Sequence, residues 1–140
     1  MEKISEFPEE LVTEYTDILK EYAEVNLWQL INRTKHDYRI EDDNSIRKIC
    51  ADAVKKILSY QEAITIIENL EGKTEVWDFS REAVAELLSQ GWNVYKKYPV
   101  DTGDKDFCLT TKEYVARLTQ SSPERVIVYT NPNQISTSND

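Results

Sequence analysis

The chain has 140 residues and a formal net charge of −9 at pH 7, and 40% of its residues are hydrophobic. This length and apolar content predict one compact domain with its own core. The negative charge argues against nucleic acid or an anionic membrane surface as a direct ligand.

The first predicted element is a long helix from Pro8 to about Thr34. Proline fits the first turn of a helix, and Ser5 is a candidate cap. The apolar side chains that follow recur at helical spacing. The predicted core stripe is Leu11, Tyr15, Ile18, Tyr22 and Val25.

Five carboxylates of this helix follow the spacing i, i+4, i+7, i+11, i+14. At about 100° per residue they fall within an arc of about 80°, along about 21 Å of one helix edge. Like charges three or four residues apart oppose helix formation by roughly 0.2–0.5 kcal/mol per pair, and the helix dipole favours acids only in the first turn. A cost without a structural gain indicates a function. Together with the tryptophan one turn further on, the predicted partner-binding residues are Glu10, Glu14, Asp17, Glu21, Glu24 and Trp28.

Two alternatives stay open for these residues. The carboxylates could be an ordinary solvated helix face, since such faces are often charged. Trp28 could pack against Tyr38 or against the second helix instead of a partner.

A charged loop from His36 to Asn44 precedes a second predicted helix. Asp43 or Asn44 can cap this helix, and Gly72 can end it. Two long helices with a short connection predict an antiparallel helical hairpin over residues 1–72. The predicted core face of the second helix is Ile46, Ile49, Ala53, Ile57, Ile64 and Ile67.

Residues 73–130 contain a weak repeat, in which Ser80–Leu87 aligns with Thr111–Leu118 at an offset of 31 residues. Each copy lies between two β-like stretches, which gives the β-α-β-β-α-β order of a ferredoxin-like unit. We therefore predict an α+β protein, with this unit packed on the helical hairpin and a flexible polar tail over residues 131–140. The predicted strands are Thr74–Phe79, Trp92–Val100, Phe107–Thr110 and Arg125–Thr130, with Asp101–Asp106 as the central turn, Gly91 ending the first short helix and Thr110 with Glu113 capping the second.

The polar clusters do not predict a metal or a cofactor. Asp101–Asp106 places three carboxylates around a glycine, but it lacks the EF-hand spacing and consists of ordinary turn residues. Glu41–Asp43 precedes a helix, where acidic caps are favoured. His36 and Asp37 are neighbours in a surface loop, and adjacency does not make a catalytic pair. We expect neither a metal nor a cofactor.

The chain also offers little to a catalyst. It has a single histidine, and no serine stands in a nucleophile elbow. The three glycines stand apart, so the loops that hold phosphates and dinucleotides are absent. Among 26 acidic residues, carboxylate pairs are too common to indicate a glycosidase. We therefore expect a protein that is not an enzyme.

Cysteine usage and hydropathy bear on the compartment. Cys50 and Cys108 each stand among apolar neighbours, which favours buried reduced thiols over a disulfide. No stretch reaches the roughly 18 apolar residues of a membrane span, and the acidic N-terminus does not resemble a secretory signal. We expect a cytoplasmic protein.

The distribution of charge favours protein binding. Residues 1–24 carry 8 acidic and 2 basic side chains. We expect the acidic helix edge to dock on a basic surface, as found on nucleic-acid-handling enzymes, in the manner of an inhibitor or immunity-type protein. The row could also imitate nucleic acid, although its spacing of about 5 Å is wider than the roughly 3.4 Å of one DNA strand.

Two hypotheses from other classes remain. A small-ligand regulatory site could use the face of the C-terminal sheet, lined by Tyr95, Tyr98, Tyr114 and Tyr129. A homodimer could form through the helical hairpin, where Leu27, Leu30 and Ile31 extend beyond the main apolar stripe.

Overall fold

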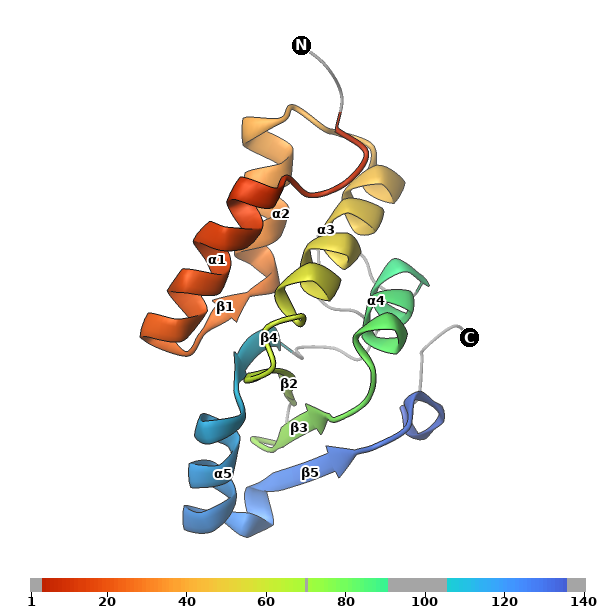
Figure 1. Ribbon diagram of the computed structural model, residues 1–140. Coiled ribbons are helices and arrows are strands. Elements are labelled where there is room, and N and C mark those ends of the chain that lie inside the picture. Colours follow the sequence, from red (N-terminus) through yellow and green to blue (C-terminus); the bar gives the residue numbers. More distant parts are fainter. Residues whose placement is uncertain (1–3, 70, 91–105, 136–140) are drawn as a thin grey trace.

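The computed structural model describes residues 4–69, 71–90 and 106–135. These residues form five α-helices and a mixed five-stranded sheet with the order β1-β4-β2-β3-β5, which confirms the α+β class (Figure 1). Strands β3 and β5 pair in parallel, and the other neighbours pair antiparallel. The elements are α1 (Glu9–Tyr22), β1 (Val25–Asn26), α2 (Leu27–Asp37), α3 (Asp43–Ile57), β2 (Ala63–Glu68), β3 (Thr74–Trp77), α4 (Arg81–Gln90), β4 (Asp106–Thr111), α5 (Lys112–Ser121) and β5 (Val126–Tyr129), with short 3₁₀ turns at Pro123–Arg125 and Pro132–Gln134.

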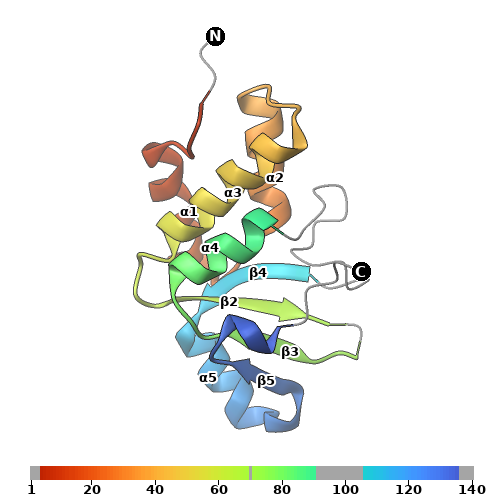
Figure 2. The ribbon, with the colours of Figure 1, turned by 90° about the vertical axis from the view of Figure 1, so that its right-hand side faces the viewer.

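The helices divide between the two faces of the sheet. Helices α1 to α4 lie on one face, and α5 lies on the other (Figure 2). The main hydrophobic core draws on α1 to α4 and on the sheet, whereas α5 has no buried residue. One face of the sheet is therefore thickly covered, and the other is covered only in part by the described residues.

The strand register explains which side chains reach each face. A cross-strand row of apolar or aromatic residues and one threonine points toward the four helices, because successive side chains of a strand alternate between faces. The next row points the other way and starts at the edge strand β1. The first row is Val25, Leu109, Thr65, Trp77 and Tyr129, and the second is Asn26, Cys108, Ile66, Val76 and Val128.

The predicted long first helix is wrong, because the chain breaks at Ala23. This residue adopts a left-handed conformation, with φ 58° and ψ 27°, and its N–H donates to the carbonyl of Leu19. Asn26 then caps α2 in a capping box with Gln29, in which each side chain accepts from the other residue's backbone N–H. Because Asn and Gln at this spacing form a start signal, the sequence held the information for a second helix.

The predicted second helix is correct only for its first half. Helix α3 ends at Ile57, and residues 63–68 form strand β2 in the middle of the sheet. Ile64 and Ile67 have helical spacing, but the stretch is rich in β-branched residues, which favour strands. The residue that caps α3 is Asp42 instead of the predicted Asp43 or Asn44. Gly72, with φ 76°, lies in the β2–β3 turn and does not end a helix. The antiparallel hairpin of two long helices is therefore wrong.

The C-terminal half follows the prediction more closely. Strands β3, β4 and β5 and helices α4 and α5 lie where the repeat places them, although the cap of α5 is Thr111 instead of Thr110. Gly91, Trp92–Val100 and residues 101–105 of the predicted turn lie outside the described residues, and β2 adds a strand that the pattern lacks. The ferredoxin-like order is therefore not confirmed. Residues 131–135 form a capped 3₁₀ turn where a flexible tail was expected, and residues 136–140 lie outside the described range.

The core also corrects the argument for a homodimer. Leu27, Leu30 and Ile31 are 1% exposed or less, because α2 packs them into the core of the same chain. They offer no surface to a second copy.

The left-handed corner predicts a stabilising substitution. Ala23→Gly should raise the free energy of unfolding by about 1 kcal/mol, because the left-handed conformation costs a residue with a Cβ roughly 1–2 kcal/mol. The control Ala116→Gly, at an exposed position inside α5, should lower it by about 0.5–1 kcal/mol. Urea unfolding of both variants measures the two values. Destabilisation by Ala23→Gly would contradict the left-handed conformation of Ala23.

A second prediction concerns a buried hydroxyl. Thr65 is 0% exposed, and its Oγ1 has no hydrogen-bond partner in the part of the chain that the structure describes. Thr65→Val should therefore stabilise the fold by about 1–2 kcal/mol, since it removes an unsatisfied polar group at nearly constant volume. Thr34→Val is the control, because the Thr34 hydroxyl donates to the Leu30 carbonyl at 2.9 Å and its loss should destabilise. If Thr65→Val lowers the thermal stability as much as Thr34→Val does, the Thr65 hydroxyl has a hydrogen-bond partner, such as a buried water molecule.

Candidate functional site

The acidic residues of α1 lie on the side of the helix that faces away from the core. Leu11, Tyr15 and Leu19 are buried on the inner side. Four exposed carboxylates, which we call the acidic row, are those of Glu10, Glu14, Asp17 and Glu21; Glu9 is also exposed but binds Lys56. Glu24 and Trp28 do not continue this row along one helix, because α1 ends at Tyr22 and Trp28 belongs to α2.

One member of the acidic row already has a partner. Glu14 binds Arg33 at 2.5 Å, and the same guanidinium binds Asp37 at 3.2 Å and lies 5.6 Å from the ring centre of Tyr15. Burial lowers the pKa of Arg33, but Tyr15 and the two carboxylates outweigh this effect and raise it above the usual value. The other three members make no ion pair or side-chain hydrogen bond within the described ranges.

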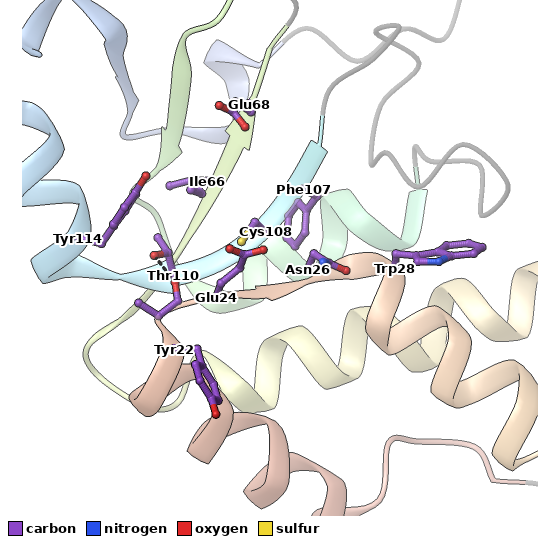
Figure 3. Close-up of a pocket in the computed structure, with 11 residues that line it drawn as sticks. Tyr22, Glu24, Asn26, Trp28, Ile66, Glu68, Phe107, Cys108, Thr110 and Tyr114 are labelled. Carbon is purple, nitrogen blue, oxygen red and sulfur yellow. Dashed lines mark hydrogen bonds between the residues drawn. The ribbon is translucent and has the colours of Figure 1, made fainter.

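A pocket of about 400 Å³ begins where α1 ends (Figure 3). It lies over the second cross-strand row, on the face of the sheet away from the four helices. Its walls come from the end of α1, β1, the first turn of α2, β2, β4 and the first turn of α5. The lining residues are Tyr22, Ala23, Glu24, Asn26, Trp28, Ile66, Glu68, Phe107, Cys108, Thr110 and Tyr114.

Exposed aromatic side chains gather around this pocket. Tyr22 is 69% exposed, Trp28 38% and Tyr114 45%, and these are three of the four large hydrophobic side chains that are exposed in the described part of the chain. Figure 3 shows them on three different sides, with Trp28 beyond Asn26. Exposed aromatics grouped around a hollow are typical of a binding surface.

The pocket is also acidic. Glu24 and Glu68 line it, and neither carboxylate makes an ion pair or hydrogen bond with the residues that the structure describes. Of the described side chains, no lysine, arginine or histidine belongs to the lining. The site therefore combines aromatic faces, two free carboxylates and an apolar floor at Ile66.

One long-range hydrogen bond helps to fix the position of the pocket, together with the pairing of β1 with β4. The Thr110 hydroxyl donates to the carbonyl of Ala23 at 2.7 Å and so joins the corner after α1 to strand β4 (Figure 3). This contact holds Tyr22 and Glu24 beside residues that are more than 80 positions later in the chain.

The structure separates the predicted site residues into two groups. It brings Glu24 and Trp28 into the pocket and leaves Glu10, Glu14, Asp17 and Glu21 on α1. Sequence reasoning missed Tyr22, which it assigned to the core, and Glu68, which it assigned to a helix. The alternation of β2, with Ile66 and Glu68 on one face, is the signal that could have found the second of these.

The proposed tyrosine site for a small ligand is not assembled by the described residues. Tyr114 lies at the pocket, whereas Tyr129 packs against the core on the opposite face of the sheet. Tyr95 and Tyr98 lie outside the described residues.

A second hollow, of about 460 Å³, lies near the start of α4. Its charged side chains balance, with Glu62 and Asp78 against Arg81 and Lys112. Arg81 already binds the Ser59 hydroxyl at 2.6 Å and Glu82 at 3.2 Å. The first pocket is the better candidate site, because its carboxylates have no partner among the described residues and its aromatic side chains are exposed.

The remaining sequence candidates that the structure describes do not form a site. Asp42 caps α3, and His36 and Asp37 are exposed at the end of α2. In residues 4–69, 71–90 and 106–135 no three His, Cys, Asp or Glu side chains are grouped as metal ligands. Within the same ranges, no helix has the length and apolar character needed to cross a bilayer.

Comparison of the chain with protein-family models, with curated proteins and with solved structures finds no match. The candidate site therefore rests on the geometry and chemistry of its own residues.

The two cysteines give a test of the pocket. Cys50 is buried, and burial raises the pKa of its thiol to about 12 although a hydrogen bond with Thr34 lowers it. Cys108 is half-buried and lines the pocket. In the folded protein at pH 8, iodoacetamide should therefore label Cys108 and leave Cys50 unmodified, because only a thiolate reacts. Peptide mass spectrometry identifies the labelled site. Equal labelling of both thiols before unfolding would contradict the packing around Cys50.

Proposed function

We propose that this chain is a non-enzymatic protein-binding protein, which docks on a basic surface of a partner through the acidic row and the neighbouring aromatic pocket. One observation carries the proposal. On the exposed side of α1, three of the four carboxylates of the acidic row have no ionic partner within the described residues. Beyond the end of this helix, Glu24 lies among exposed aromatic side chains. Charge and exposed aromatic surface therefore adjoin one another.

The two parts of this surface would act differently. The row and the overall negative charge would speed the encounter with a basic partner, since complementary potentials steer association. The aromatic side chains would slow dissociation, because large side chains that become fully desolvated supply most of the binding energy at interfaces. Glu14 would contribute less than its neighbours, because Arg33 already neutralises it.

Enzymes that handle nucleic acids carry the kind of surface that this site would bind. Their basic patches neutralise phosphates, and an acidic protein that covers such a patch blocks access to the substrate. We propose an inhibitor or immunity-type role on this ground, as an analogy of class and not of family.

Charge reversal on α1 tests the docking surface. The triple variant Glu10→Lys, Asp17→Lys, Glu21→Lys should lose about tenfold or more of the affinity for the partner that the wild type captures from lysate. Binding by the wild type should also weaken between low and moderate salt, since exposed charges are screened. Affinity capture followed by titration of the recovered partner measures both effects.

The matched control is Glu41→Lys, Glu71→Lys, Glu124→Lys. These exposed carboxylates lie in loops or the 3₁₀ turn away from α1, and their reversal changes the net charge by the same amount. The control should keep most of the affinity. If both variants bind equally while circular dichroism shows both folded, the acidic row is an ordinary solvated face.

A further inference from the structure

Within the described residues, the surroundings of Arg33 show how this fold binds a guanidinium group. Arg33 lies over the ring of Tyr15, with Glu14 at 2.5 Å and Asp37 at 3.2 Å. An aromatic face and two carboxylates thus hold one arginine side chain between α1 and α2. A cation over a ring recurs at Lys20, whose Nζ lies 5.1 Å from the ring centre of Tyr60.

The pocket presents the same set of groups, and none of the described residues places a cation in its lining. Tyr22 and Tyr114 supply aromatic faces, and Glu24 and Glu68 supply carboxylates that have no partner among the described residues. Figure 3 shows the carboxylate of Glu24 between Tyr22 and the side chains of β2 and β4, with Glu68 further along the same face. Ile66 lies between the two acids and can cover the methylene part of a long side chain.

We propose that the pocket binds an arginine side chain of the partner's basic surface. This inference rests on the proposed docking function and names its anchor. Guanidinium is planar and weakly hydrated, stacks on aromatic rings and binds carboxylates with two parallel hydrogen bonds, whereas the lysine ammonium is a strongly hydrated point charge. The mixture of rings and carboxylates therefore favours arginine over lysine.

The ligand extends beyond the pocket. From Glu10 to Glu21 the acidic row covers about 16 Å of helix, at 1.5 Å per residue. A free amino acid cannot span this length together with the pocket, but a basic protein segment can place one arginine in the pocket and further cations along α1. The volume of about 400 Å³ falls within the range of ligand-binding pockets.

Hexa-arginine and hexa-lysine peptides carrying the same fluorophore test the inference by anisotropy. The wild type should bind hexa-arginine about fivefold more tightly than hexa-lysine, as a desolvated cation–π contact implies. The pocket variant Tyr114→Leu, Glu68→Gln should lose this preference and still bind both peptides through α1. Saturating hexa-arginine should also slow iodoacetamide labelling of Cys108 at least threefold in the wild type.

The outcomes separate this inference from the docking function. Equal affinity for the two peptides, with no protection of Cys108, overturns the arginine pocket even if the triple variant of α1 shows that docking is correct. If the wild type prefers hexa-arginine and the pocket variant loses this preference, the arginine pocket is supported. This holds even if charge reversal on α1 has no effect, a result that would contradict docking through the acidic row. An arginine preference that the pocket variant retains places the anchor elsewhere and overturns the inference.

Discussion

The corner at Ala23 is the constraint on which the candidate site depends. Its left-handed backbone ends α1, and the Thr110 hydroxyl holds its carbonyl at 2.7 Å. From this corner the chain enters β1 at the edge of the sheet and then reverses into α2, which the Asn26 capping box starts. A continuous helix, by contrast, would carry Glu24 and Trp28 away from strand β4. The break therefore places both residues in the lining of the same pocket as Cys108 and Tyr114.

Helices α4 and α5 cover the two faces of the sheet unequally. The repeat places α4 and α5 after parallel strands, yet α4 buries Val84 and Leu88 in the core while α5 buries nothing fully. Among the described helices, α5 is the one on this face of the sheet. Within the described residues, Tyr114 of this helix therefore lines the pocket over the strip from β1 to β2 without filling it. An unevenly covered sheet with polar and aromatic residues along the gap is suited to binding, since its backbone is already paired and rigid.

How far the sequence predicts this molecule depends on the range of each interaction. The core stripe of α1 and the strand-helix repeat are local patterns, and the α+β class followed from them. The predicted caps of α3 and α5, by contrast, missed the residues that cap these helices. The boundary between α3 and β2 was misread because Ile64 and Ile67 fit a helix as well as a strand, and only pairing with β4 decides the matter. The pocket was beyond reach in the same way, because tertiary contacts that no sequence spacing encodes bring Tyr22 and Glu68 into the lining of one pocket.

Basic side chains of the protein neutralise some of its acidic residues and leave others without a partner among the described residues. Lys56 binds Asp52 at 3.0 Å, Glu9 at 3.5 Å and Glu6 at 3.6 Å, and it donates to the Phe7 carbonyl, so it fixes the N-terminal segment on α3. Arg33 similarly fixes α1 on α2 through Glu14. These two cations offset repulsion where helices must pack, whereas Glu10, Asp17, Glu21 and Glu24 receive no such partner in the described residues. The repulsion between these carboxylates is therefore kept on one exposed side of the molecule, although the fold relieves it elsewhere. This unrelieved repulsion is the physical argument for a cationic ligand at that surface.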